Sequence, residues 1–336
     1  MGTLDVNMLN VRPILLDLQA QLQAFDVSEN VYLSCSSAGS GANPTTSQRR
    51  VNALGINEEE LPAILRLLGI RSLSLSARHD LRALAAFNVE IPANAASELC
   101  QWCYLRNEAV ITELRALFQH CRTVAFDEWA TLSGASDLWD GLLVDVIKPL
   151  GKPDLEFIFY LGDSGRKLSF QVDEALDIIS DFAQHGQVTF ALDEGEAIKL
   201  WMVFNGVHPD TPTAPQNYPD RKKKYFSIFR MMRITRLLIY SANEVLLLTN
   251  QQQFVLARHK VATSIELGAA ARQDFIAGFS LGMLLRLDVA HCIALGLLVF
   301  GSAGERQANP TPQDLLTYIN QWIEELQKPE IIHLYQ

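Results

Sequence analysis

Apolar and polar segments alternate at a regular pitch through the middle of this chain. Between residues 106 and 249, short apolar runs of strand length are separated by amphipathic segments of helical length. The pattern predicts strands at 123–126, 155–160, 188–191, 237–241 and 244–249, and helices at 110–120, 139–147, 173–184 and 194–205. Because helix-strand repeats of this pitch build parallel sheets, we expect a three-layer α/β fold: a mostly parallel sheet with helices on both faces.

The first 115 residues follow a less regular pattern. Residues 9–25 predict a helix, 31–34 and 72–75 predict strands, and Asn57 followed by three glutamates predicts a helix start at 57–68. The segment 36–50 is rich in Gly, Ser, Thr and Asn, which predicts a loop. Its small residues suit a phosphate cradle, but it lacks the Lys-Ser/Thr ending of a P-loop, so a surface loop is the alternative.

The stretch 268–304 predicts two consecutive apolar helices after a turn of small residues. Phe275, Phe279 and Met283 recur at helical spacing, while Gly278 and Gly282 leave the adjoining face thin enough for close packing. Small residues ahead of a helix allow its first N–H groups to point at an anion, where the positive end of the helix dipole also lies. This stretch is therefore the strongest candidate for a phosphate site.

Composition narrows the classes of function. The chain has 336 residues, 49% hydrophobic and 20% charged, which is typical of a globular protein with a large core. Its net charge of −10 argues against general nucleic-acid binding. No signal peptide is recognisable and the apolar runs are too short to span a bilayer, so we expect no membrane partner and a soluble cytoplasmic protein. The 5 cysteines fit a reducing compartment.

The amino-acid sequence at the start of the first apolar helix resembles a known signature. Residues 275–279 read Phe-Ile-Ala-Gly-Phe, similar to the Phe-x-Ala-Gly-Phe that follows a Gly-Ala-Gly-Asp turn in PfkB/ribokinase-like carbohydrate kinases. The turn itself is not retained. Its two glycines fall on Ala270 and Arg272, and the family's catalytic aspartate falls on Gln273; a carboxylate follows at Asp274.

The resemblance implies phosphoryl transfer from Mg²⁺-ATP to a hydroxymethyl group of a sugar or nucleoside. Asp274 would then accept the alcohol proton, and backbone amides of Ala270, Ala271, Arg272 and Gln273 would form the anion hole. A glutamine cannot accept a proton at neutral pH, and adjacent helical residues differ in direction by about 100°. Either Asp274 replaces the missing base or the catalysis is lost.

Two further short matches extend the resemblance. After the strand at 188–191, Glu196 matches the acid of the family's Asn-x-x-Glu motif, which implies a role near the magnesium ion. A first-turn glutamate that complements the helix dipole is the alternative. The turn at 162–166 resembles the family's Asp-x-Asn-x-Arg, and Arg166 would then bind the transferred phosphate. An ordinary turn with an exposed arginine explains it nearly as well.

Two other features have plain structural explanations. Cys100 and Cys103 form a lone Cys-x-x-Cys, for which core thiols on a helix are a better interpretation than a zinc or redox site. The basic run 221–224 opens a helix and predicts a solvated helical face; the alternative is a positively charged lip for nucleotide phosphates.

The chain is thus expected to be one α/β domain over residues 1–336. Residues 116–330 would form its ribokinase-like part and residues 1–115 a divergent part that could act as a lid. The first functional hypothesis is a divergent sugar or nucleoside kinase that uses ATP and Mg²⁺. The alternative is a catalytically inactive relative with a binding or regulatory role, and an unrelated α/β protein is the third reading. A homodimer is a further expectation.

Overall fold

The computed structural model describes most of the chain. The described residues are 6–8, 10–24, 31–34, 57–75, 80–87, 101–127, 129–132, 134–207, 218–241, 244–257, 269–306 and 311–327. The predicted loop at 36–50 and Cys100 lie outside them. Side chains at 269–273 and at 166 are also outside the description.

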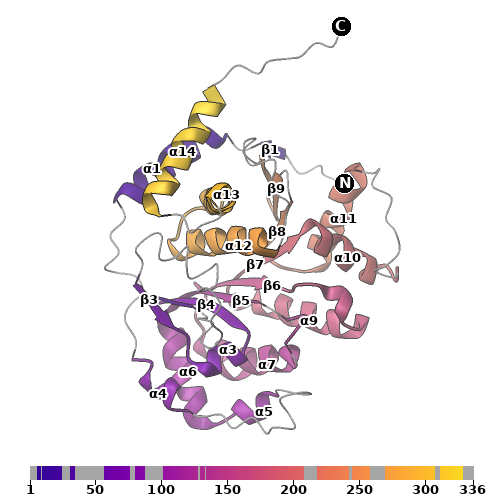
Figure 1. The fold of residues 1–336 in the computed structure, drawn as a ribbon. Helices are drawn as coiled ribbons and strands as arrows, with labels where there is room; N and C mark the ends of the chain where they lie inside the picture. The colour runs from indigo at the N-terminus through magenta and orange to yellow at the C-terminus, as the bar shows by residue number, and fades with distance from the viewer. Residues whose placement is uncertain are drawn as a thin grey trace.

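The described residues form a ten-stranded sheet in the order β1-β10-β9-β8-β7-β6-β5-β4-β2-β3 (Figure 1). The strands are β1 (Val6–Met8), β2 (Val31–Ser34), β3 (Asn57–Glu60), β4 (Ile70–Leu75), β5 (Cys121–Phe126), β6 (Glu156–Tyr160), β7 (Gln187–Asp193), β8 (Arg236–Tyr240), β9 (Glu244–Thr249) and β10 (Gln253–Ala257). β5 to β8 are parallel neighbours, whereas β4 and β9 flank them in the antiparallel direction.

Helices cover both faces of the sheet. They are α1 (Val11–Ala24), α3 (Ala63–Leu67), α4 (Arg82–Ala86), α5 (Trp102–Leu105), α6 (Glu108–His120), α7 (Ala135–Leu142), α8 (Lys148–Leu150), α9 (Ser169–Phe182), α10 (Glu194–Phe204), α11 (Tyr218–Met231), α12 (Ala269–Leu284), α13 (Val289–Arg306) and α14 (Pro312–Gln327). A π-helical turn, Leu143–Ile147, joins α7 to α8. The predicted three-layer α/β fold is confirmed.

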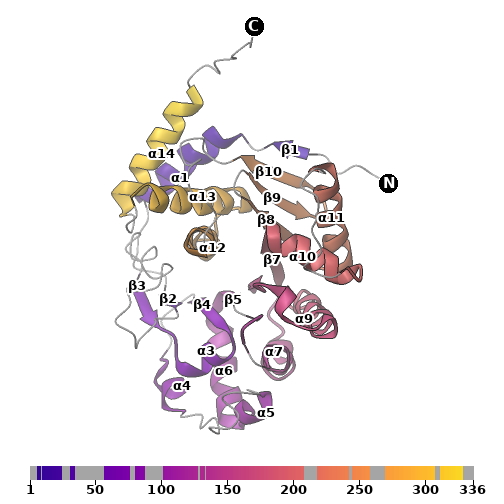
Figure 2. The ribbon, with the colours of Figure 1, turned by 45° about the vertical axis from the view of Figure 1, so that its right-hand side comes forward.

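The two faces carry two separate hydrophobic cores. Side chains alternate along β6: Phe157 and Phe159 pack into the core under α6, α7, α9, α10 and α11, whereas Ile158 and Tyr160 pack against α12 and α13. Burial on both faces explains why the central strands read as nearly continuous apolar runs. Figure 2, which views α12 along its axis, places α13 over α12, with α1 and α14 farther out.

The close packing predicted from the glycines of α12 is confirmed. A Cβ atom added to Gly278 would lie 2.7 Å from the carbonyl oxygen of Leu295, and one added to Gly282 would lie 2.8 Å from Cα of Cys292. α12 and α13 therefore approach each other with backbone against backbone. This contact fixes the position of α12 over the sheet.

The N-terminal part differs from its predicted secondary structure. Residues 57–60 are the strand β3, paired in parallel with β2, and the helix after them covers only Ala63–Leu67. The prediction of a helix start at Asn57 is wrong because pairing with β2 supplies backbone hydrogen bonds that a local sequence signal does not reveal.

The same N-terminal residues extend the main sheet. β4 pairs with β5, and β2 pairs with β4, both in the antiparallel direction. The described strands β2, β3 and β4 thus belong to the same sheet as the parallel strands. The lid function of residues 1–115 stays a prediction.

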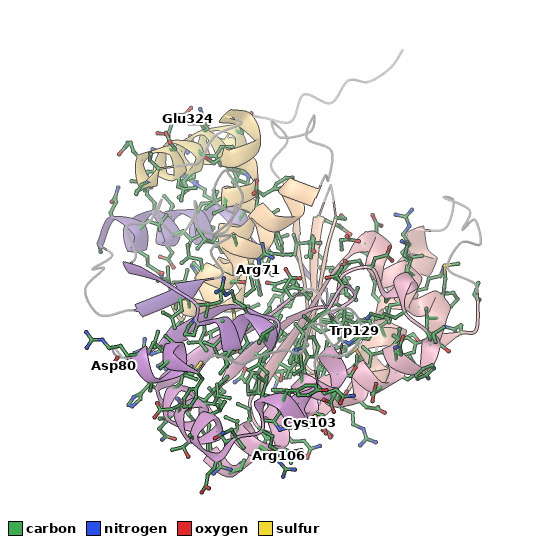
Figure 3. The ribbon with its side chains drawn as sticks, turned by 60° about the horizontal axis from the view of Figure 1, so that its bottom comes forward. Arg71, Asp80, Cys103, Arg106, Trp129 and Glu324 are labelled. Carbon is green, nitrogen blue, oxygen red and sulfur yellow. The ribbon has the colours of Figure 1, made fainter. Side chains whose placement is uncertain are left out.

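Cys103, labelled in Figure 3, is exposed on α5. The interpretation of this residue as a core thiol is wrong, because Trp102 and Leu105 occupy the inward positions of this short helix.

Candidate functional site

Contacts along α12 show which end of the helix lies at which edge of the sheet. Near its start, the Phe275 ring stacks on Tyr240, the last residue of β8, with ring centroids 4.9 Å apart. Further along, Ser280 Oγ lies 3.0 Å from the hydroxyl of Tyr160, the last residue of β6. Just beyond its end, Arg286 shares a cavity with Glu156, the first residue of β6. α12 therefore starts at the carboxyl edge of the parallel strands and runs toward their amino edge.

The predicted anion-hole residues lie in the first turn of this helix. α12 begins at Ala269, so Ala270, Ala271, Arg272 and Gln273 follow directly. The first N–H groups of an α-helix have no partner within the helix, and the amides of Ala270 and Ala271 belong to this group. The amides of Arg272 and Gln273 lie where pairing with the residue four positions earlier begins. Backbone donors and the positive end of the dipole thus coincide at the carboxyl edge.

Asp274 is buried one residue later, with 6% of its surface exposed. The helix is continuous from Ala269 to Leu284, so no bulge rotates Asp274 into the direction of Gln273. Residues seven apart lie on the same side of a helix, which aligns Gln273 with Ser280, the partner of Tyr160. Asp274 instead aligns with Gly278, which packs against α13. As neighbours in a continuous helix, the two positions are about 100° apart around the helix axis.

Glu196 lies at the same edge of the sheet, on the first turn of α10 after β7. Its backbone N–H donates to Oδ1 of Asp193 at 2.7 Å, and its Oε2 accepts from the N–H of Asp193 at 2.9 Å. These reciprocal bonds form a capping box that stabilises the start of α10. The structural alternative considered for Glu196 is thus present in the contacts. The side chain is nevertheless buried, with 5% exposed, which a simple surface cap does not require.

The donor chemistry at this helix start is compatible with a magnesium ion that arrives with a nucleotide. Mg²⁺ prefers oxygen ligands, retains several waters and is commonly held by one or two carboxylates together with substrate phosphates. Glu196 offers such an oxygen next to Asp193 and Glu194. In the part of the chain that the structure describes, no group of three or more His, Cys, Asp or Glu side chains is placed to enclose a metal.

Arg166 closes the short 3₁₀ turn Ser164–Arg166 after β6. Asp163 caps this turn by accepting from the N–H of Gly165 at 3.2 Å, and it pairs with Lys199 of α10 at 3.0 Å. The ion pair ties the loop after β6 to the helix after β7, so both lie at the carboxyl edge. Sequence reasoning missed Lys199, whose only local signal is its position one turn after Glu196.

The basic run at the start of α11 is engaged in contacts within the chain. Arg221 pairs with Glu194, and Lys222 lies 3.8 Å from Glu244. The ammonium group of Lys224 lies 4.4 Å from the ring centroid of Trp201. The face predicted to be solvated is thus half-buried at these three residues, and the pairing of Arg221 and Lys222 with carboxylates argues against a phosphate-binding lip.

None of the helices within the described ranges is both long enough and apolar enough to cross a membrane. No protein-family model matches this chain, and no curated protein matches it.

Several of the solved structures that resemble it are described as kinases. A carbohydrate kinase from Agrobacterium tumefaciens aligns over 88% of this chain and 94% of its own, with 12% identity and a TM-score of 0.45. The nucleoside kinase of Methanocaldococcus jannaschii, an archaeal member of the ribokinase family, aligns over 87% and 95%, with 11% identity and a TM-score of 0.44.

A protein from Rhizobium etli described as a probable sugar kinase aligns over 63% of this chain, with 17% identity and a TM-score of 0.41. The match spans only 55% of that protein's own length. The similarity of all three concerns the fold. Identities of 11% to 17% and TM-scores of 0.41 to 0.45 define neither an activity nor a substrate for this chain.

Proposed function

We propose that this chain is a divergent sugar or nucleoside kinase-like protein that binds the phosphates of ATP at the start of α12. The observation that supports this proposal most is the location of that helix start at the carboxyl edge of β6, β7 and β8. Ligands of open α/β sheets bind outside the carboxyl ends of the strands, and anions bind at helix starts.

Phosphoryl transfer needs positioning and electrostatic stabilisation more than covalent chemistry from the protein. The amides of Ala270 and Ala271 would donate to the phosphate oxygens on which negative charge develops, assisted by the backbone of Arg272 and Gln273. Arg166 would bind the same phosphate from the loop after β6. A guanidinium group suits this task because its parallel N–H donors match two phosphate oxygens.

Asp274 would accept the proton of the substrate's hydroxymethyl group. It is the carboxylate within the described part of α12 that lies closest to the helix start. Glu196 would hold the magnesium ion, directly or through water. When bound with ATP, Mg²⁺ neutralises part of the charge on the phosphates. Desolvation at a buried site would strengthen each of these interactions.

A specific observation favours a second candidate, a catalytically inactive relative that keeps the nucleotide site. Gln273 shares its side of α12 with Ser280, which faces the end of β6, whereas Asp274 shares its side with Gly278, which faces α13. A glutamine at the position aligned with the sheet cannot take a proton. In that case the protein binds nucleotide or sugar in a regulatory role.

Calorimetry with Mg-ATP, followed by an ADP-release assay over a panel of sugars and nucleosides, separates the two candidates. The kinase predicts binding and turnover of at least one panel member. The inactive relative predicts binding without turnover. Asp173→Asn, on an exposed position of α9, is the matched control for Asp274→Asn. Absence of Mg-ATP binding by the unmodified chain would contradict both candidates.

A further inference from the structure

A cavity opens at the amino edge of the parallel strands, opposite to the start of α12. It has a volume of about 470 Å³, within the range of small-molecule sites, and we call it the amino-edge cleft. Arg122, Arg236 and Arg286 contribute its positive charge, and Met283, Leu287 and Val289 its apolar wall. The cleft is lined by the amino ends of β5, β6, β7 and β8 and by the connection between α12 and α13. It is thus separate from the site at the start of α12.

The acidic side chains of the amino-edge cleft already have partners. Glu156 Oε2 lies 2.9 Å from a guanidinium nitrogen of Arg236, and Asp154 lies 3.9 Å from Lys152. Asp288 accepts from the N–H of Ala290 at 3.0 Å, at the start of α13. The negative charge of the cleft is therefore largely compensated within the protein.

Asp288 also has a side-chain partner, since its Oδ2 lies 2.7 Å from Nδ1 of His291. By contrast, the exposed guanidinium of Arg286 forms no ion pair or hydrogen bond among the described residues. Burial raises the pKa of the Glu156 carboxyl and the charges of Arg236 and Arg286 act against that rise, but no described carboxylate contacts the Arg286 guanidinium directly.

The backbone at Arg286 is strained. Its φ of 56° makes it the one residue other than glycine with a positive φ within the described ranges. The N–H of Arg286 donates to the carbonyl of Met283 at 3.1 Å, and that of Leu287 donates to Gly282 at 3.1 Å. This pair of bonds is the Schellman termination of a helix, in which glycine normally occupies the left-handed position. An arginine at this position suggests that its side chain serves a purpose that outweighs the strain.

We propose that the amino-edge cleft binds a small organic oxyanion, a phosphate monoester or a carboxylate, with Arg286 as its principal ligand. Two parallel N–H donors of a guanidinium match two oxygens of either group. Arg122 of β5 and Arg236 of β8 also line the cleft, and Glu156 together with Gln187 holds Arg236 in place. The carbon skeleton of the ligand would lie against Met283, Leu287 and Val289.

Calorimetric titration with two probes tests this proposal: glycerol 3-phosphate for the phosphate monoester and succinate for the carboxylate. We expect at least one probe to bind with a dissociation constant below about 10 mM. Arg286→Gly and Arg286→Ala should each weaken that binding by about tenfold or more. The control is Arg82→Ala, which changes an arginine whose side chain is 94% exposed on α4 and should leave the affinity unchanged.

Two controls separate a loss of probe binding from effects on folding and on the proposed kinase site. Glycine readily adopts the positive φ of residue 286, so Arg286→Gly should retain the melting temperature of the unmodified chain. A loss of probe binding by this variant then reflects the loss of the guanidinium group. The probes should bind equally well to Asp274→Asn, because that residue lies at the other end of α12. The proposal is overturned if neither probe binds, if both Arg286 variants keep full affinity, or if Asp274→Asn removes the binding.

Discussion

The two ends of α12 differ in how they can attract an anion. At its start, backbone N–H groups and the positive end of the dipole would act together on the proposed phosphate. At its end, the dipole is negative and repels an anion. A side chain must supply the attraction there, and Arg286 does so from a strained backbone position.

The two proposed sites depend on the sequence in different ways. The proposed site at the start of α12 depends on where the helix begins. Arg272, which stands where the family motif has glycine, therefore does not remove the backbone amide donors. The second depends on one guanidinium, so a single substitution should remove it. One helix would thus link the proposed backbone site at the carboxyl edge to the proposed side-chain site at the amino edge.

The largest expected effect concerns catalysis at the start of α12. If Asp274 is the base, Asp274→Asn should lower turnover by about 10²–10⁴-fold while Mg-ATP still binds, because the amides remain in place. Initial rates of ADP release measure this effect. The matched variant Gln273→Asp should add little to a kinase that already uses Asp274.

If the chain is an inactive relative, the outcome for the two variants is reversed. Gln273→Asp should then confer turnover on a protein that had none, and Asp274→Asn should change nothing. Equal turnover of the unmodified chain and Asp274→Asn would remove Asp274 as the base.

The next effect concerns the middle of α12, which holds both ends in position. Gly278→Ala places a methyl group against the backbone of α13, and we expect it to destabilise the fold by about 1–3 kcal/mol. Chemical denaturation measures the loss. Gly195→Ala in α10, where the nearest atom is a carboxylate oxygen at 3.3 Å, is the control and should cost less. Equal costs would show that the α12–α13 contact adapts easily.

A smaller effect is expected at the end of α12. Arg286→Gly and Arg286→Ala both remove the guanidinium, but only glycine relieves the left-handed backbone. Arg286→Gly should therefore be more stable than Arg286→Ala by about 1 kcal/mol. Paired urea denaturation curves measure the difference. If the two variants unfold at the same urea concentration, the backbone at residue 286 stores no strain. The backbone then gives no reason to infer a special purpose for the Arg286 side chain.

The smallest effect concerns pH at the start of α13. Desolvation tends to raise the pKa of Asp288, but hydrogen bonds from His291 and Ala290 outweigh it, and the pKa is lowered. A lowered pKa in the folded state means that the stabilisation is complete above the unfolded value of about 3.9 and is lost as the pH falls through the folded pKa. Asp288→Asn should flatten the acid limb of melting temperature against pH. An unchanged acid limb would assign acid sensitivity to other groups.

The sequence predicted the central sheet and α12 well because their signals are local. Strands buried on both faces read as apolar runs, so β5 to β9 were found within about two residues of their bounds. The spacing of Phe275, Phe279 and Gly278 likewise predicted a helix that packs closely against its neighbour.

Features that depend on pairing across the sheet were not predictable. The acidic run of β3 gives a helix-start signal that only its pairing with β2 overrules. β10 (Gln253–Ala257) follows β9 after a short turn and was missed, although it is as long as β6 and β8, which were predicted. The amino-edge cleft assembles residues far apart in the chain, such as Arg122 and Arg286, and its one local sign, the backbone of Arg286, is visible only in three dimensions.

The central claim is that phosphate binds to the backbone at the start of α12. Alanine-selective ¹⁵N labelling, with the signals of residues 270 and 271 assigned by substitution, tests it during a titration with Mg-ATP. The account predicts that the amide signals of Ala270 and Ala271 shift most and saturate together with calorimetric binding. Saturated Mg-ATP binding with both signals unmoved would contradict it.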